Sequence, residues 1–162
     1  MKVAVLMGSK SDLSIMEEAS VVLKQFGIDC EMRIMSAHRT PDEVLAFSRD
    51  AKANGFSVII AGAGMAAHLA GVIAAHTTLP VIGVPIASSS LNGMDALLAM
   101  VQMPPGVPVA TVSVGKAGAK NAALLAVEIL ALNNEGLQKR LAQYRSDMRK
   151  TVLEEDDSIK NS

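Results

Sequence analysis

Five short apolar runs alternate with longer segments of helical period along this 162-residue chain. The runs are at 3–7, 30–35, 57–61, 81–84 and 107–112, and the helical segments are at 11–26, 41–54, 65–75, 91–101 and 118–132. Strands that alternate with helices in this way form a parallel sheet with helices on both faces. The sequence therefore predicts an α/β fold, a three-layer sandwich around a five-stranded parallel sheet.

The composition changes after residue 133. Residues 134–153 combine many charges of both signs with apolar residues at helical spacing, which are Leu137, Leu141, Tyr144 and Met148. This pattern predicts an amphipathic helix that acts as a lid or a subunit contact, because a membrane-surface helix would carry mainly positive charge. We expect residues 1–162 to form one domain, with the sandwich core in 1–132 and a frayed tail in 154–162.

The bulk composition argues against several kinds of partner. A net charge of −1 provides no field that would attract nucleic acid or an anionic membrane. Half of the residues are hydrophobic, so we expect some apolar surface to lie between subunits. The three histidines and the single Cys30 lack metal-ligand spacing, so no metal is expected. The apolar segment 58–75 contains glycines and fits a strand, a turn and a helix, so the chain is expected to be cytoplasmic.

Ligands in open parallel sheets bind beyond the carboxyl ends of the strands, so the loops at that edge are the candidate site. The first of these loops contains Ser9, Ser11 and Asp12 just before a helix. Serine hydroxyls at a helix start either hold a phosphate or cap the helix, and the sequence leaves both open. Asp12 is suited to ribose hydroxyls, because a carboxylate repels a phosphate.

The second loop reads Ser36-Ala37-His38-Arg39-Thr40-Pro41. Arginine offers planar donors for phosphate or carboxylate, and histidine exchanges protons near neutral pH. The segment from Thr40 to Glu43 has the pattern of a capping box with proline at the first helical position, which predicts a helix starting directly after Arg39.

The third loop brings small residues to the same edge, with Gly64 and Ala66 ahead of His68. The run resembles a dinucleotide fingerprint only weakly, because it follows the third strand and the fourth strand ends without an acidic residue. It fits a nearly apolar pocket lined by backbone amides. His68 either points into this pocket or packs on the helix, and its place in a helical pattern favours packing. His76 lies near the end of this predicted helix, where it is expected to interact favourably with the negative end of the helix dipole.

Six ordered motifs cover about residues 3 to 153 of the chain. They are GSKSD (8–12), SAHRTP (36–41), AGAGMAAHLAG (61–71), PVIGVP (80–85), VQMPPGVPVAT (101–111) and GAKNAALLA (118–126). Together they resemble the PurE family of purine biosynthesis, and within it the class I enzymes, which are N5-carboxyaminoimidazole ribonucleotide mutases.

The resemblance implies a flavodoxin-like sandwich that assembles into a homo-octamer with active sites where subunits meet. It also implies transfer of a carboxyl group from N5 to C4 of an imidazole ribonucleotide through enclosed CO2, without a cofactor. His38 would be the general acid/base. The implied substrate-binding residues are Ser9, Ser11, Asp12, Ser36, Ala37, Arg39, Gly64, Ala66 and His68.

The chain departs from the family pattern beside the expected CO2 pocket. Met65 and Ala70 stand where glycine and proline are usual, and Leu13 stands where tryptophan is common. One alternative is the class II relative, which carboxylates aminoimidazole ribonucleotide directly with CO2. A flavin carrier or a phospho-receiver is more distant, because the chain has no tryptophan for flavin stacking and no aspartate ending the third strand at Ala61.

Overall fold

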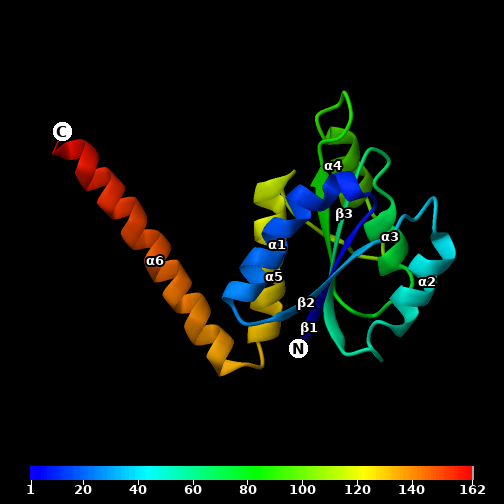
Figure 1. The fold of residues 1–162 in the computed structure, drawn as a ribbon, viewed down its shortest axis with the longest axis horizontal. Helices are drawn as coiled ribbons and strands as arrows, with labels where there is room; N and C mark the ends of the chain where they lie inside the picture. Colours follow the sequence, from blue (N-terminus) through cyan, green and yellow to red (C-terminus); the bar gives the residue numbers. More distant parts are fainter. Residues whose placement is uncertain (162) are drawn as a thin grey trace. The chain divides into compact units, whose positions relative to one another are not determined.

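The computed structural model describes residues 1–161. Its centre is a parallel five-stranded sheet in the order β2-β1-β3-β4-β5 (Figure 1). The strands are β1 (Lys2–Met7), β2 (Asp29–Ile34), β3 (Phe56–Gly64), β4 (Val81–Ile86) and β5 (Ala110–Thr111). This confirms the predicted α/β class and the parallel sheet.

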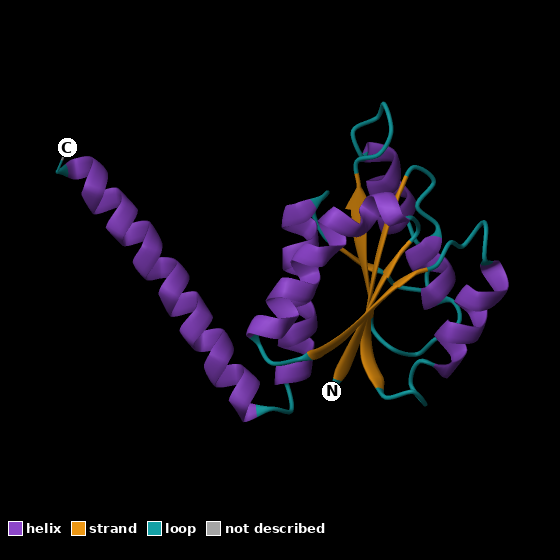
Figure 2. Ribbon diagram, viewed as in Figure 1, coloured by secondary structure: helices purple, strands orange, loops and turns teal. Residues whose placement is uncertain are grey.

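Helices cover both faces of the sheet (Figure 2). The helices are α1 (Leu13–Gln25), α2 (Pro41–Asp50), α3 (Leu69–Ala74), α4 (Met94–Val101), α5 (Lys116–Ala131) and α6 (Glu135–Lys160), with a 3₁₀ turn η1 (Lys10–Asp12) before α1. Residues of α2, α3 and α4 share one buried cluster with β1 and β3. On α1, Glu18 forms ion pairs with Lys116 and Lys120 of α5.

The two central strands β1 and β3 supply most of the sheet's core. Val3, Ala4, Val5 and Leu6 of β1 are completely buried, as is the run Val58–Ala61 of β3. Strands covered by helices on both faces bury alternate side chains on each face, so they appear in the sequence as continuous apolar runs. This is the physical reason that these runs could be found without any structural information.

Chain contacts divide the molecule into residues 1–126 and residues 127–162. The first unit holds the sheet. In the second, Asn134 caps the N-terminus of α6, and its side chain accepts a hydrogen bond from the Leu137 amide at 3.0 Å. None of the helices in the described part of the chain is both long enough and apolar enough to span a membrane.

The predicted frayed tail is wrong for residues 154–160, which continue α6 to Lys160. Two i, i+4 ion pairs support this end of the helix, Lys150 with Glu154 and Asp156 with Lys160. Such pairs stabilise a helix. The segment also lacks glycine and proline, so no residue in it ends the helix.

Glycines with a left-handed backbone follow α1 and α2, and the start of α2 differs from the predicted capping box. Gly27 and Gly55 have φ angles of 67° and 82°, the left-handed backbone expected where a helix ends in glycine. The predicted capping box at Thr40 is wrong, because the Thr40 side chain makes no cap bond. Its hydroxyl instead accepts from the Ser36 amide at 2.9 Å and donates to the Ser36 carbonyl at 3.1 Å. Thr40 therefore closes the loop ahead of α2.

Two elements are shorter than predicted. The third helix starts at Leu69 and not at 65, because β3 continues to Gly64 and pairs there with Ile86. The last strand is limited to Ala110–Thr111, because the preceding Pro108 has no amide proton for the sheet. Residues 65–68 therefore form a loop at the carboxyl edge of the sheet.

Candidate active site

The carboxyl ends of the strands surround a cavity of about 540 Å³. Loops after β1, β2, β3 and β4 supply its walls. All ten residues predicted for the site line it: Ser9, Ser11, Asp12, Ser36, Ala37, His38, Arg39, Gly64, Ala66 and His68. The geometry thus brings the predicted residues together, while their individual roles remain predictions.

The loop after β1 is organised by mutual bonds between Ser9 and Asp12. The Ser9 amide donates to Asp12 Oδ2 at 3.1 Å, and the Ser11 amide donates to Ser9 Oγ at 3.3 Å. The first of these bonds, together with a bond from the Asp12 amide to the Ser9 side chain, forms a capping box on η1. The capping role left open by the sequence is therefore present, and it fixes the same two side chains against the cavity.

Asp12 is the one charged side chain buried in this wall, with 5% of its surface exposed. Burial raises the pKa of its carboxyl group, because the charged form loses hydration. Hydrogen bonds from the Ser11 hydroxyl and the Ser9 amide, and the charge of Arg39, act in the opposite direction and limit that rise in pKa. The carboxyl group is thus held in place by neighbours that favour its ionised form.

The loop after β2 is a tight turn from Ser36 to Thr40. The Thr40 amide donates to the Ser36 carbonyl at 2.9 Å, in addition to the hydroxyl bonds described above. Arg39 reaches across to the first loop, where its Nη2 donates to the Gly8 carbonyl at 2.7 Å, and its Nε donates to Ser36 Oγ at 3.4 Å. A guanidinium has five N–H donors, so these bonds leave it able to bind an anion as well.

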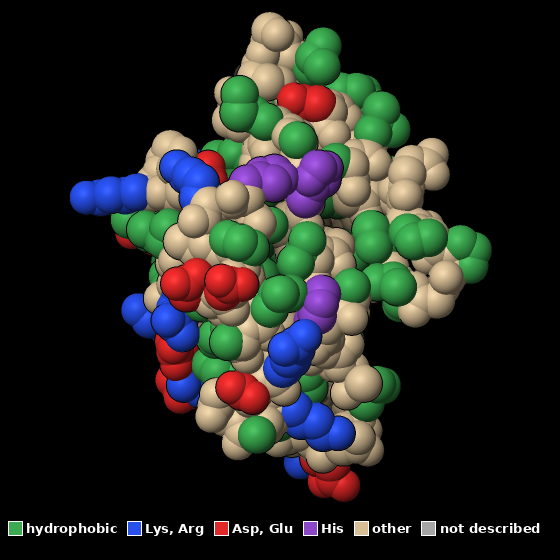
Figure 3. All heavy atoms as spheres, turned by 90° about the vertical axis from the view of Figure 1, so that its right-hand side faces the viewer, with side chains coloured by type: hydrophobic (Ala, Val, Ile, Leu, Met, Phe, Trp, Pro, Cys, Tyr) green, Lys and Arg blue, Asp and Glu red, His purple; other side chains and the backbone are tan. Residues whose placement is uncertain are grey.

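The side chains of His38 and His68 contact each other although they are 30 residues apart. His38 Nε2 lies 2.8 Å from His68 Nδ1, and the rings meet edge to face with centroids 4.9 Å apart. Two of the three histidines also lie side by side on the molecular surface (Figure 3). The preference for a packed His68 is wrong, because the loop after β3 places this residue at the cavity and before α3. The third, His76, contacts the Val72 carbonyl through Nδ1 at 2.8 Å.

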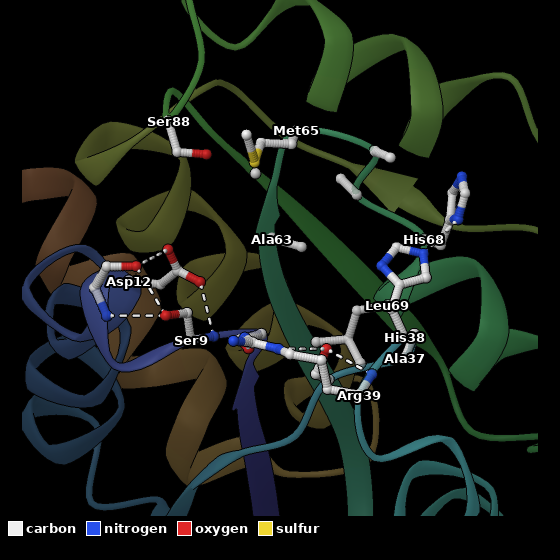
Figure 4. A pocket seen from close by; sticks show the side chains of 16 residues that line it. Ser9, Asp12, Ala37, His38, Arg39, Ala63, Met65, His68, Leu69 and Ser88 are labelled. Atoms are coloured by element: carbon white, nitrogen blue, oxygen red, sulfur yellow. Dashed lines mark hydrogen bonds between the residues drawn. The ribbon is translucent and has the colours of Figure 1, made fainter.

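The end of β3 and the loop after it contribute mainly small residues to the cavity, with Met65 among them (Figure 4). Gly64 has no room for a side chain, because an added Cβ would collide with Ser88 Oγ. Ser88 comes from the loop after β4 and completes the lining. Ser88 was not among the predicted site residues, although the position of the serines at 88–90 directly after a strand is a signal that could have identified it. The other lining residues outside the predicted set are Gly8, Ala63, Met65, Ala67 and Leu69.

The cavity has two chemically different halves. The half at Ser9, Asp12 and Arg39 offers hydroxyls, a carboxylate and a guanidinium, which suit a phosphate and sugar hydroxyls. The half at Gly64 and Ala66 is small and apolar, and it adjoins the histidine pair. Within residues 1–161, no three His, Cys, Asp or Glu side chains are placed to hold a metal ion together. The arrangement suits proton transfer to a bound phosphorylated sugar derivative.

Comparison with known proteins agrees with this geometry. Residues 2–151 match the family model described as AIR carboxylase. The chain is 57% identical over 152 residues to the N5-carboxyaminoimidazole ribonucleotide mutase of Saccharolobus solfataricus, covering 94% of this chain and 95% of that one. It is 52% identical over 157 residues to the enzyme of the same name from Bacillus subtilis, covering 97% of each.

The fold also matches a solved structure. The crystal structure of Treponema denticola PurE superimposes with a TM-score of 0.88 and 31% identity, over 97% of each chain. The family match spans nearly the whole of the described chain and includes every loop that lines the cavity. The chain therefore belongs to the AIR carboxylase, or PurE, family.

Proposed function

We propose that this chain is an N5-carboxyaminoimidazole ribonucleotide mutase that moves a carboxyl group from N5 to C4 of the imidazole. Relatives bearing that name are 49–57% identical over at least nine-tenths of the chain. The observation that carries the proposal is the single cavity that joins the phosphate-suited loop at Arg39 to the imidazole of His38. A ribonucleotide that reacts at its base needs an anion-binding group for its phosphate and a proton-transfer group for its base within one cavity.

In this proposal the polar half of the cavity binds the ribose phosphate. The Arg39 guanidinium and the hydroxyls of Ser9 and Ser11 bind phosphate oxygens, and Asp12 accepts hydrogen bonds from ribose hydroxyls. The capping box and the Arg39 bond to Gly8 fix these groups before the substrate arrives. Preorganised groups lose less conformational entropy when they bind.

The imidazole of His38 serves both proton steps. It delivers a proton to N5 while the N5–carboxyl bond breaks, which gives aminoimidazole ribonucleotide and CO2. C4 then attacks CO2, and the same imidazole takes the C4 proton so that the ring regains aromaticity. The protons balance, because His38 gives one proton to N5 and recovers one from C4. General acid–base catalysis of this kind typically raises a reaction rate by about 10²- to 10⁴-fold.

The small-residue half of the cavity holds the migrating group. Ser36 and Ala37 come from one side, and Gly64 and Ala66 come from the other. Their short side chains leave space for CO2 and provide few groups that bind water. An enclosed apolar space keeps the intermediate from escaping or reacting with solvent.

We further propose that the active form is a cytoplasmic homo-octamer. The outer side of α4 and the turn before it support association, because Met94, Leu98 and Val101 of the helix and Leu91 of the turn are about half exposed. Exposed apolar stripes of this kind mark contact surfaces. Light scattering of the purified protein is expected to give eight times the 16.9 kDa chain mass, and a monomer mass would contradict the assembly.

Supplying the purified protein with each of two substrates tests the reaction itself. We expect the N5-carboxylated ribonucleotide to be converted rapidly to the 4-carboxy product. Rapid conversion of aminoimidazole ribonucleotide with bicarbonate, and none of the carbamate, would instead assign the class II carboxylase reaction.

A further inference from the structure

Met65 has a backbone conformation that is unfavourable for methionine. Its φ angle is 56°, and among residues 1–161 the one other non-glycine residue with positive φ is Asn92. Asparagine tolerates this left-handed region, whereas a longer side chain is strained there. Strained backbone persists where the surrounding structure enforces it, and it is concentrated at functional sites.

The neighbouring residues enforce this conformation. Gly64 ends β3 and pairs with Ile86 of β4. An added Cβ on Gly64 would collide with Ser88 Oγ, so the chain passes directly against the loop after β4. The backbone therefore leaves the sheet in a fixed direction and delivers the Met65 side chain to the cavity.

Within this chain, the Met65 side chain is not buried in the core. It is 60% exposed, yet it lines the cavity, and Figure 4 shows it near Ser88 and above Ala63. A thioether is apolar, flexible and a weak hydrogen-bond acceptor, so it adapts to a neighbour without holding water. An adaptable apolar side chain beside a polar binding site is suited to covering what is bound there.

We propose that Met65 determines how well the enzyme retains CO2, by covering the small-residue half of the cavity while the carboxyl group is free. The inference rests on the proposed function. When the N5–carboxyl bond breaks and N5 receives its proton, CO2 is held by no covalent bond until the C4–carboxyl bond forms. Retention of CO2 during that interval depends on the residues that enclose it, and Met65 is the large, exposed residue between Gly64 and Ala66.

An isotope experiment tests this role. The enzyme receives unlabelled N5-carboxylated ribonucleotide in ¹³C-bicarbonate with carbonic anhydrase, and the ¹³C content of the first 4-carboxy product is measured. We expect little label with the wild type and several-fold more label with both Met65→Ala and Met65→Gly. Asn92→Gly is the matched control, because it changes the other left-handed position outside the cavity lining, and its product should resemble the wild-type product.

Comparing the two Met65 variants separates the side chain from the backbone. Both remove the thioether, but only glycine relieves the strain, so equal label in their products supports the covering role. Wild-type label content with either variant would overturn the proposal. Met65→Gly should melt at or above the wild-type temperature, and a lower melting temperature would instead make Met65 a packing residue.

The experiment also distinguishes this inference from the proposed function. If the wild-type enzyme forms no 4-carboxy product from the carbamate, the function itself fails and the inference fails with it. If the wild type forms the product with little label, and the Met65 variants do the same, only the inference fails.

Discussion

His38 Nε2 and His68 Nδ1 lie 2.8 Å apart, so one proton is shared between the two rings. Two N–H groups at this distance would repel each other, as would two lone pairs. If His38 donates, its other nitrogen, Nδ1, is left as a base, and if it accepts, the neutral ring carries its proton on Nδ1. Figure 4 shows both imidazoles at the edge of the cavity. Under the proposed function, the tautomer of His38 is therefore tied to that of His68.

Replacing His68 tests this positioning role. His68→Phe keeps a ring but removes the contacting nitrogen, so we expect kcat to fall about tenfold with KM nearly unchanged, which is less than the contribution of about 10²- to 10⁴-fold from the acid–base group itself, because His38 remains. His68→Asn places an amide group near the position of Nδ1 and should retain more activity than His68→Phe. Steady-state kinetics check both variants, and equal losses would indicate that His68 is needed only for its bulk.

Replacing Arg39 tests the anion-binding half of the cavity. Charged hydrogen bonds contribute about 1.5–3 kcal/mol each, so Arg39→Ala should weaken ribonucleotide binding about 10- to 100-fold with a smaller effect on kcat. Arg39→Lys keeps the charge but loses the planar pair of donors, and should lie between wild type and Arg39→Ala. Calorimetric titration with the ribonucleotide measures this order, and unchanged affinity in Arg39→Ala would make the arginine structural.

The raised pKa of Asp12 makes stability depend on pH. Because the folded pKa lies above the ordinary value of 3.8, the native state binds more protons than the unfolded state as pH rises from about 4. Stability is therefore lost with rising pH in that window and regained as pH falls. Asp12→Asn removes this titration, so its melting temperature relative to wild type should increase between pH 4 and pH 7. Thermal melts at several pH values check this, and a constant difference would contradict it.

The contact between Gly64 and Ser88 predicts a paired substitution. Gly64→Ala should destabilise the protein by about 1–3 kcal/mol, because its Cβ would collide with Ser88 Oγ. Adding Ser88→Gly removes the colliding side chain and should restore part of the stability, although the Ile86 carbonyl remains 3.0 Å from the new Cβ. Chemical denaturation of both variants measures the coupling. If the stability losses simply add, the two residues do not interact as described.

The sheet and the site loops could be predicted from sequence because their signals are local. Continuous apolar runs such as Val3–Met7 identify buried parallel strands, and the sheet-edge rule then identifies Ser9, Asp12, His38 and Arg39. The C-terminal end of β3 could not be predicted from its apolar run. Glycine and alanine fit either a strand or a helix, so the sequence did not show that pairing with β4 continues to Gly64.

The same uncertainty hid the pairing of the two histidines. With β3 ending at Gly64, His68 lies in a loop and not within a helix, and its ring reaches a residue 30 positions away. Side-chain direction across separate loops depends on the assembled sheet, so no local pattern could report it. The bonds of the Thr40 hydroxyl also could not be predicted. The turn between Ser36 and Thr40 is not specified by a local sequence pattern, and in it the hydroxyl bonds to the Ser36 backbone and does not cap the helix.

The most direct test of the central claim is single-turnover conversion of the N5-carboxylated ribonucleotide by His38→Asn, with binding measured on the same preparation. If His38 is the acid and the base, the variant should bind the ribonucleotide with near wild-type affinity and form the 4-carboxy product at least 10²-fold more slowly. Product formation at close to the wild-type rate would contradict the account.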